Sequence, residues 1–132
     1  MTTSDLPAEG QPDVSTEGTE APFDDVITLS TSTDEAGVVT VTVVGEVDTF
    51  TAPVLRSTLD SQLEQQPREL VIDLSGVQFL GSAGLAVLVE TQKSARAREV
   101  SLRLIATTRA VTRPLEVTGL IDLFTIADST AR

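Results

Sequence analysis

The chain has 132 residues, enough for one compact domain, and because only 3% of them are aromatic its core should be aliphatic. The sequence contains no Cys and no His, which excludes disulfides, most zinc and transition-metal sites, thiol nucleophiles and a histidine base. Its 20 acidic and 9 basic residues give a net charge of −11, which argues against binding to nucleic acid. We therefore expect no metal, no cofactor and no nucleic-acid partner.

The N-terminal segment is acidic and poor in large apolar side chains. Residues 1–25 hold seven Asp and Glu residues and no Lys or Arg. Such a segment cannot bury enough apolar surface to offset about 1–2 kcal/mol of backbone ordering entropy per residue. We predict a disordered acidic tail over residues 1–23 and one folded domain over residues 24–132. Because we find no secretory leader and no apolar run of membrane length, we expect a soluble, cytoplasmic protein without a membrane partner.

The first elements after this segment form a predicted hairpin. Residues 26–32 alternate between two faces, and residues 38–44 are rich in β-branched side chains, so both are expected to be strands. The sequence Asp-Glu-Ala-Gly at 34–37 predicts the turn between them, and Gly-Glu-Val-Asp at 45–48 ends the second strand.

A helix is predicted after the hairpin. Thr51 supplies a hydroxyl for its N-cap, and Pro53 suits its first turn. The helix is expected to end near Pro67. Apolar residues recur at intervals of four on one of its faces, namely Leu55, Leu59 and Leu63.

The central segment changes its period from a strand to a helix. Residues 70–74 form a nearly unbroken apolar run, which is typical of a strand buried on both faces of a parallel sheet. From Ser82 onward the apolar residues are spaced like one face of a helix. We expect a loop between these elements, in which two glycines, Gly81 and Gly84, flank Ser82 and Ala83. Ser82 would then lie at a helix N-terminus, where free N–H groups and the helix dipole favour negative charge.

The C-terminal part adds predicted strands at 100–104 and 123–127 and a helix over 108–118 that Gly119 stops. Strands that alternate with helices after an initial hairpin predict an α/β fold. In this fold the helices pack on a mixed, mostly parallel sheet.

Ser82 is the candidate functional residue of the central segment. A hydrolase nucleophile elbow is excluded, because Leu80 stands where that motif requires Gly and the chain has no His. A phosphate-binding loop of the P-loop type is not supported, because its Gly-Lys-Ser/Thr ending is missing. From the residues alone two interpretations stay open: a serine that receives a phosphate, and a serine that only caps the helix.

Two motifs resemble a known family. Asp-Leu-Ser-Gly-Val-Gln-Phe-Leu-Gly-Ser-Ala-Gly-Leu at 73–85 resembles the signature of STAS-domain anti-sigma factor antagonists. The family pattern runs Asp/Asn-Leu-x-x-Val-x-Phe-Met/Leu-Asp-Ser-Ser/Thr-Gly-Leu. Gly-Glu-Val-Asp at 45–48 is similar to the family's Gly-Glu-Leu-Asp. The order of predicted elements agrees over residues 26–127, so the resemblance implies a single STAS-like domain that is not an enzyme and has no catalytic residues.

The resemblance implies a phosphorylation switch. The unmodified antagonist would bind an anti-sigma factor that is also a serine kinase of the GHKL type, which frees the sigma factor for transcription. The kinase would phosphorylate the first serine of the motif, here Ser82, and a PP2C-type phosphatase would reverse the modification. The chain would then be a bacterial phosphoprotein that regulates transcription by partner switching.

Two positions depart from the family pattern. Gly81 stands in place of Asp, and Ala83 stands in place of the second Ser or Thr. Because Ala83 has no hydroxyl, the resemblance assigns the phosphate of this segment to Ser82. It places the partner-binding residues at Glu46, Asp48, Gly81, Ser82, Ala83 and Gly84. Asp48 has a second interpretation, as the cap of the helix that begins near Thr51.

An alternative from a different class is a constitutive STAS scaffold, a subunit of a larger complex in which Ser82 is only a helix cap. A sensor of small ligands ranks behind both hypotheses, because the sequence indicates no polar cavity in the core. Phosphorylation by a co-expressed kinase would separate the antagonist from the scaffold.

Overall fold

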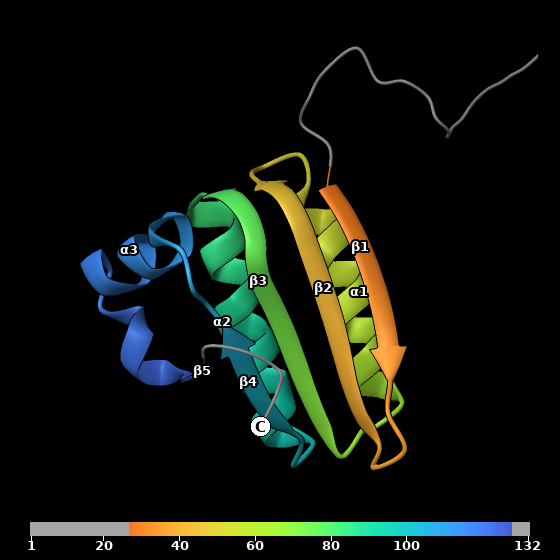
Figure 1. Ribbon diagram of the computed structural model, residues 1–132. Helices are drawn as coiled ribbons and strands as arrows, with labels where there is room; N and C mark the ends of the chain where they lie inside the picture. Colours follow the sequence, from red (N-terminus) through yellow and green to blue (C-terminus); the bar gives the residue numbers. More distant parts are fainter. Residues whose placement is uncertain (1–26, 128–132) are drawn as a thin grey trace, which may run out of the picture.

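The computed structural model describes residues 27–127, which form one sheet with helices packed against it (Figure 1). The predicted tail over residues 1–23 lies outside the described residues, as do the outer ends of the predicted domain, residues 24–26 and 128–132. The strands are β1 (Ile27–Thr33), β2 (Val38–Val47), β3 (Glu69–Leu80), β4 (Ser101–Ile105) and β5 (Thr125–Ala127). The helices are α1 (Ala52–Glu64), α2 (Ser82–Ala97), α3 (Arg109–Val117) and the 3-10 helix η1 (Leu120–Leu123).

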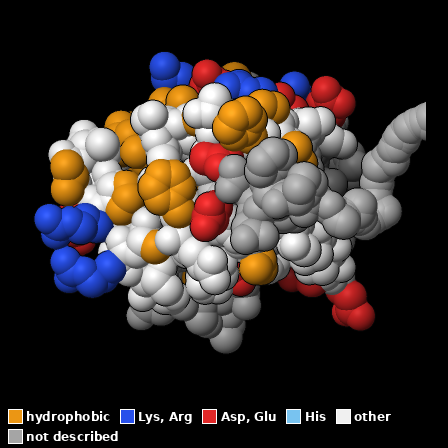
Figure 2. Space-filling view, turned by 90° about the horizontal axis from the view of Figure 1, so that it is seen from above, with side chains coloured by type: hydrophobic (Ala, Val, Ile, Leu, Met, Phe, Trp, Pro, Cys, Tyr) orange, Lys and Arg blue, Asp and Glu red, His pale blue; other side chains and the backbone are white. Residues whose placement is uncertain are grey.

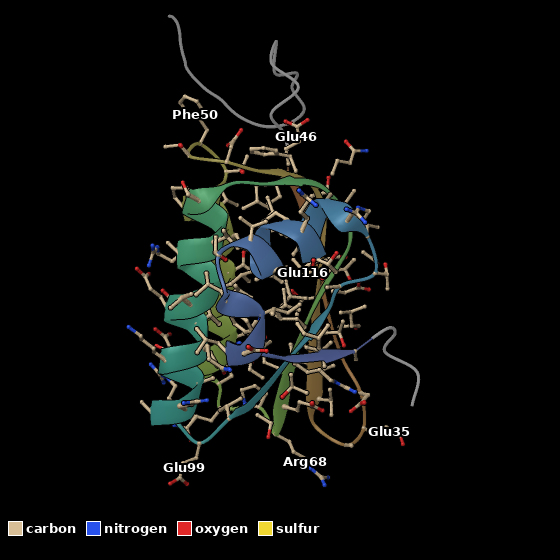
Figure 3. The ribbon with its side chains drawn as sticks, turned by 90° about the vertical axis from the view of Figure 1, so that its left-hand side faces the viewer. Glu35, Glu46, Phe50, Arg68, Glu99 and Glu116 are labelled. Atoms are coloured by element: carbon tan, nitrogen blue, oxygen red, sulfur yellow. The ribbon has the colours of Figure 1, made fainter. Side chains whose placement is uncertain are left out.

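The sheet has five strands in the order β1-β2-β3-β4-β5. β1 and β2 are antiparallel, and the pairs from β2 to β5 are all parallel. Helices α1, α2 and α3 lie on one side of this sheet (Figure 3). This arrangement confirms the predicted α/β domain, with an N-terminal hairpin followed by a mixed, mostly parallel sheet.

The core between the sheet and the helices is aliphatic apart from Phe124, close to what the composition predicts. The side chains spaced by four on α1, namely Leu55, Leu59 and Leu63, are fully buried. Every second residue in the middle of β2 contributes to the same cluster, namely Val39, Val41 and Val43. Both predicted periods therefore hold in these elements, because each packs one face against the core.

The second half of β3 departs from the prediction. The strand extends further than its apolar run over residues 70–74 indicates, because β3 continues to Leu80. The register against β2 shifts twice, and each shift adds one residue to β3: Thr42↔Asp73 is followed by Val44↔Gly76, and Gly45↔Val77 is followed by Glu46↔Phe79. The residues of β3 that belong to the core cluster are therefore spaced by two at Leu70, Ile72 and Leu74 and by three at Val77 and Leu80, while the buried Val71 lies on the other face. Such bulges hide a strand from a search for strict alternation.

The connection between β2 and α1 differs from the prediction in its hydrogen bonds. Thr51 directly precedes α1, but its hydroxyl caps no N–H of the helix. The hydroxyl instead donates to the Glu46 carbonyl oxygen at 2.8 Å and accepts from the Asp48 N–H at 2.9 Å. The prediction of a Thr51 side-chain cap is therefore wrong, and Thr51 fixes the turn that follows β2.

The C-terminal elements follow the predicted order. Helix α3 lies within the predicted range, and Gly119 follows its last turn. The last strand is shorter than predicted, because residues 120–123 form η1 and β5 begins only at Thr125. Within residues 27–127, no helix combines the length and the apolar character needed to cross a membrane.

Candidate partner-binding site

The candidate site lies at one end of the sheet, where β2 and β3 finish side by side and α2 begins. The Gly81 N–H donates to the Val47 carbonyl oxygen at 2.9 Å, and Leu80 pairs with Val47 in the sheet. The carboxyl ends of neighbouring parallel strands are a frequent location of binding sites in α/β folds. The structure brings the predicted site residues together at this end: Glu46, Asp48, Gly81, Ser82, Ala83 and Gly84. We call the region formed by residues 44–54 and 76–85 the Ser82 surface.

Ser82 is exposed and is the first residue of α2. The residue at the N-cap position is Gly81, which has an extended backbone, and no side chain caps the N-terminus of the helix. The interpretation of Ser82 as a helix cap is therefore wrong, and the scaffold alternative loses the role that it gave to this serine. A hydroxyl at this position lies beside the free N–H groups of the first turn, which favour a negative charge.

Asp48 organises the turn between β2 and α1. One oxygen of its carboxylate accepts hydrogen bonds from the N–H groups of Phe50 at 2.9 Å and Thr51 at 3.0 Å. The Asp48 carbonyl oxygen also accepts from the Ala52 N–H at 2.8 Å. Phe50 and Thr51 precede α1, so the carboxylate stabilises the turn before the helix and caps no N–H of α1 itself. The Asp48 side chain is half-buried at the edge of the surface, and its role in partner binding stays a prediction.

Glu46 lies one strand away from the end of β3, in register with Phe79. Its side chain is half-buried, and Figure 3 shows it at the same end of the domain as Phe50. Neighbouring residues in register on parallel strands point to the same side of the sheet. Glu46 and Phe79 therefore share the sheet face opposite to the buried pair Val47 and Leu80.

Gly84 and Gly81 have packing roles at this end. A Cβ atom on Gly84 would lie 2.6 Å from Cγ1 of Val47 and 2.7 Å from Cδ1 of Leu80, so only glycine lets α2 approach the sheet this closely. A Cβ atom on Gly81 would lie 3.0 Å from the ring of Phe79. Ala83 is half-buried against the core. Gly84 thus lets α2 pack closely on the ends of β2 and β3, and the proposed contact of Gly81, Ala83 and Gly84 with a partner stays a prediction.

Two exposed aromatic residues belong to the surface and were missed in the sequence. Phe50 is 80% exposed and Phe79 is 50% exposed. The signal was present, because Phe50 stands between two Thr residues in a polar turn and Phe79 follows Gln78 directly. Only the structure shows that both rings point away from the core.

A shallow groove of about 440 Å³ starts at Ser82 and follows the outer side of α2. Its walls include Leu85, Ala86 and Val89 of α2, and Leu120 of η1 on the other side. Lys93 lies further along the same helix. The groove is an open surface feature with a mainly apolar lining.

The described residues offer no alternative chemistry around Ser82. Within residues 27–127, no group of three or more His, Cys, Asp or Glu side chains could hold a metal ion. The whole chain contains no His or Cys that could activate the Ser82 hydroxyl. The surface offers the exposed hydroxyls of Ser82 and Thr49, two carboxylates and two aromatic rings, which suits recognition by a partner.

Comparison with known proteins agrees with this geometry. Residues 31–132 match the STAS domain family. The anti-sigma-F factor antagonist RsfB of Mycobacterium tuberculosis is 35% identical over 100 residues, which cover 76% of this chain and 80% of RsfB. The anti-sigma-B factor antagonist of Listeria monocytogenes is 37% identical over 84 residues, 64% of this chain and 74% of that protein. The crystal structure of an anti-sigma factor antagonist from Mycobacterium paratuberculosis has a TM-score of 0.75 at 38% identity and covers 85% of this chain and 92% of that one.

The fold and the matched residues are those of a STAS domain. The chain belongs to the family of STAS domain anti-sigma factor antagonists. The proteins of this family are non-enzymatic regulators, which agrees with the prediction that the chain is not an enzyme.

Proposed function

We propose that this chain is a cytoplasmic anti-sigma factor antagonist that is switched by phosphorylation of Ser82. In the unmodified state it binds an anti-sigma factor that is also a serine kinase of the GHKL type, and so it releases a sigma factor for transcription. Phosphorylated Ser82 ends this binding, and a PP2C-type phosphatase restores it. The observation that carries the proposal is the exposed hydroxyl of Ser82 on the first residue of α2, where it has no capping role.

The other hydroxyls of the central segment are poorer acceptors. The Ser75 hydroxyl donates to the Asp73 carboxylate at 2.6 Å. The Thr91 side chain is 2% exposed, and its hydroxyl donates to the Val87 carbonyl oxygen. Ser75 is exposed but its hydroxyl is engaged by Asp73, and Thr91 is buried, so both are poorer acceptors than the exposed Ser82. Thr49, in the turn after β2, is exposed and is the competing acceptor on the same surface.

The chemistry of phosphate transfer explains why phosphorylation of Ser82 weakens binding to the kinase. The Ser82 oxygen attacks the γ-phosphorus of the kinase's nucleoside triphosphate, the bond to the nucleoside diphosphate breaks, and a base of the kinase takes the hydroxyl proton. The product carries about −1.5 to −2 charges at pH 7 and faces the negatively charged diphosphate. Repulsion between these groups favours dissociation. A thousandfold loss of affinity needs only about 4 kcal/mol, a cost in the range of an unpaired buried charge.

The test uses the full chain and the GHKL-type anti-sigma factors of the source organism, each purified separately. Calorimetric titration of the unmodified chain should show that one of them binds. Incubation of that kinase with the chain and ATP should place the phosphate on Ser82, as mapped by mass spectrometry. Thr49→Ala should be modified like the parent chain, and Ser82→Ala should not be modified. Phosphate on Thr49 with Ser82 unmodified, or no binding to any of these proteins, would contradict the proposal.

A further inference from the structure

Two of the four Phe residues lie on the Ser82 surface, although the core has room for aromatic side chains. Phe124 is 8% exposed and belongs to the core, whereas Phe50 and Phe79 are 80% and 50% exposed. Exposed aromatic rings cost solvation free energy in the free protein and are enriched among the residues that dominate binding at interfaces. Their position on the Ser82 surface therefore indicates that this surface binds a partner.

The backbone that carries the two rings is ordered. The Phe50 N–H donates to the Asp48 carboxylate at 2.9 Å, which fixes the turn that carries the ring. Phe79 lies in β3, in register with Glu46, and its ring passes 3.0 Å from the point where Gly81 would carry a Cβ atom. Backbone positions that are already ordered lower the entropic cost of binding. Both rings can thus dock without a rearrangement of the strand ends.

The charge of the surface limits the kinds of partner. Residues 44–54 and 76–85 contain the carboxylates of Glu46 and Asp48 and no Lys or Arg. Figure 2, which looks onto this end of the domain, shows hydrophobic side chains beside acidic ones. A second copy of the chain would bring like charges together across a two-fold axis, and an anionic lipid surface would repel the carboxylates. The surface fits a protein that presents apolar pockets with Lys or Arg at their rim.

We propose that Phe50 and Phe79 are the apolar anchors of partner binding and that Glu46 and Asp48 pair with basic residues around them. This inference rests on the proposed function, because it takes the anti-sigma factor as the partner. The two Phe anchors contribute affinity in both the unmodified and the phosphorylated chain, whereas Ser82 changes its charge between these two states. The surface therefore divides into a constant part and a switched part. The switched part faces the anionic nucleotide of the kinase, and the constant part faces its basic side chains.

The test measures the affinity of the anti-sigma factor that binds the parent chain, by calorimetric titration of full-length variants. Phe50→Ala and Phe79→Ala should each weaken binding at least about 30-fold, the size expected of a central interface anchor. Val117→Ala is the matched control, because Val117 is an apolar residue of α3 that is 73% exposed and lies outside residues 44–54 and 76–85, and it should bind within about threefold of the parent. Phe79→Leu keeps an apolar side chain in β3 and should lose less affinity than Phe79→Ala. The thermal midpoint of Phe50→Ala should equal that of the parent, since the ring packs against little of the domain.

Three results would overturn the inference. If Phe50→Ala and Phe79→Ala bind like Val117→Ala, the anchors are wrong while the antagonist function stands. If sedimentation shows that the parent chain is a dimer and Phe50→Ala a monomer, the rings serve self-association. If no anti-sigma factor binds the parent chain, the proposed function fails, and the inference fails with it.

Discussion

In the first half of β3, Leu70, Ile72 and Leu74 face the helices at every second position, whereas Val77 and Leu80 do so at a spacing of three. Residues 69–73 each have a partner on both β2 and β4, whereas the residues after Asp73 pair with β2 alone and across two shifts in register. The second half bulges against β2 and thereby turns Phe79 outward and delivers the chain to Ser82. The same strand thus builds the core by strict alternation and the partner surface by a departure from it.

The largest expected effect is a loss of stability when a buried side chain is removed from the regular half of β3. Ile72→Ala removes a fully buried side chain from the centre of the core and should lower the free energy of unfolding by about 2–5 kcal/mol. Urea denaturation followed by circular dichroism measures this change. Gln78→Ala, an exposed site in the irregular half, is the control and should change the free energy of unfolding by less than about 0.5 kcal/mol. Equal effects at both sites would contradict the division of β3.

The second prediction concerns the contact between α2 and the strand ends, which an added methyl group would overpack. Gly84→Ala places a Cβ atom 2.6 Å from Val47 and should cost about 1–3 kcal/mol of stability. Gly81→Ala is the matched variant and should cost less, because the nearest atom belongs to the exposed Phe79 ring, which can move. Thermal unfolding of both variants compares them. A larger loss in Gly81→Ala would show that the ring, and not the helix contact, is the rigid element.

The third prediction separates the two roles of Asp48. Asp48→Ala loses both hydrogen bonds of the turn and should lower the free energy of unfolding by about 1 kcal/mol. Asp48→Asn keeps an acceptor oxygen and should fold like the parent, but it should bind the anti-sigma factor more weakly because it lacks the charge. If Asp48→Asn binds with unchanged affinity, Asp48 stabilises the turn and its charge has no role in partner binding.

The smallest expected effect on stability is at Ser82 itself. Loss of an N-cap side chain typically costs about 1 kcal/mol, but Ser82 caps no N–H, so Ser82→Ala should change the free energy of unfolding by less than about 0.5 kcal/mol. Urea denaturation of the parent and the variant gives the difference. A loss of about 1 kcal/mol would restore the cap interpretation.

The sequence predicted the parts of this fold that repeat. The four-residue spacing of Leu55, Leu59 and Leu63 located α1, because a helix packed on a sheet buries one face at that interval. The alternation of Val39, Val41 and Val43 located β2 for the matching reason. These patterns depend only on the local period and on which side meets the core.

The features that were not predicted from the sequence depend on contacts between residues that are distant in the chain. The bulges of β3 exist because its end is paired with β2, and no local pattern encodes that register. The Thr51 hydroxyl bonds to Glu46 rather than to the helix because the turn after β2 brings them together. The exposure of Phe50 and Phe79 was not predicted, although the polar neighbours of both residues were a signal for it. The position of Ser82 was predicted correctly, since the change from strand to helix period marks it closely.

The measurement that tests the proposed switch most directly compares one chain in two states. The unmodified chain and the chain phosphorylated on Ser82 are titrated against the same GHKL-type anti-sigma factor, with the modification verified by mass spectrometry. The switch predicts that phosphorylation weakens binding by about a thousandfold, or about 4 kcal/mol, while the far-ultraviolet spectrum of the domain stays the same. Equal affinity of the two states would contradict it.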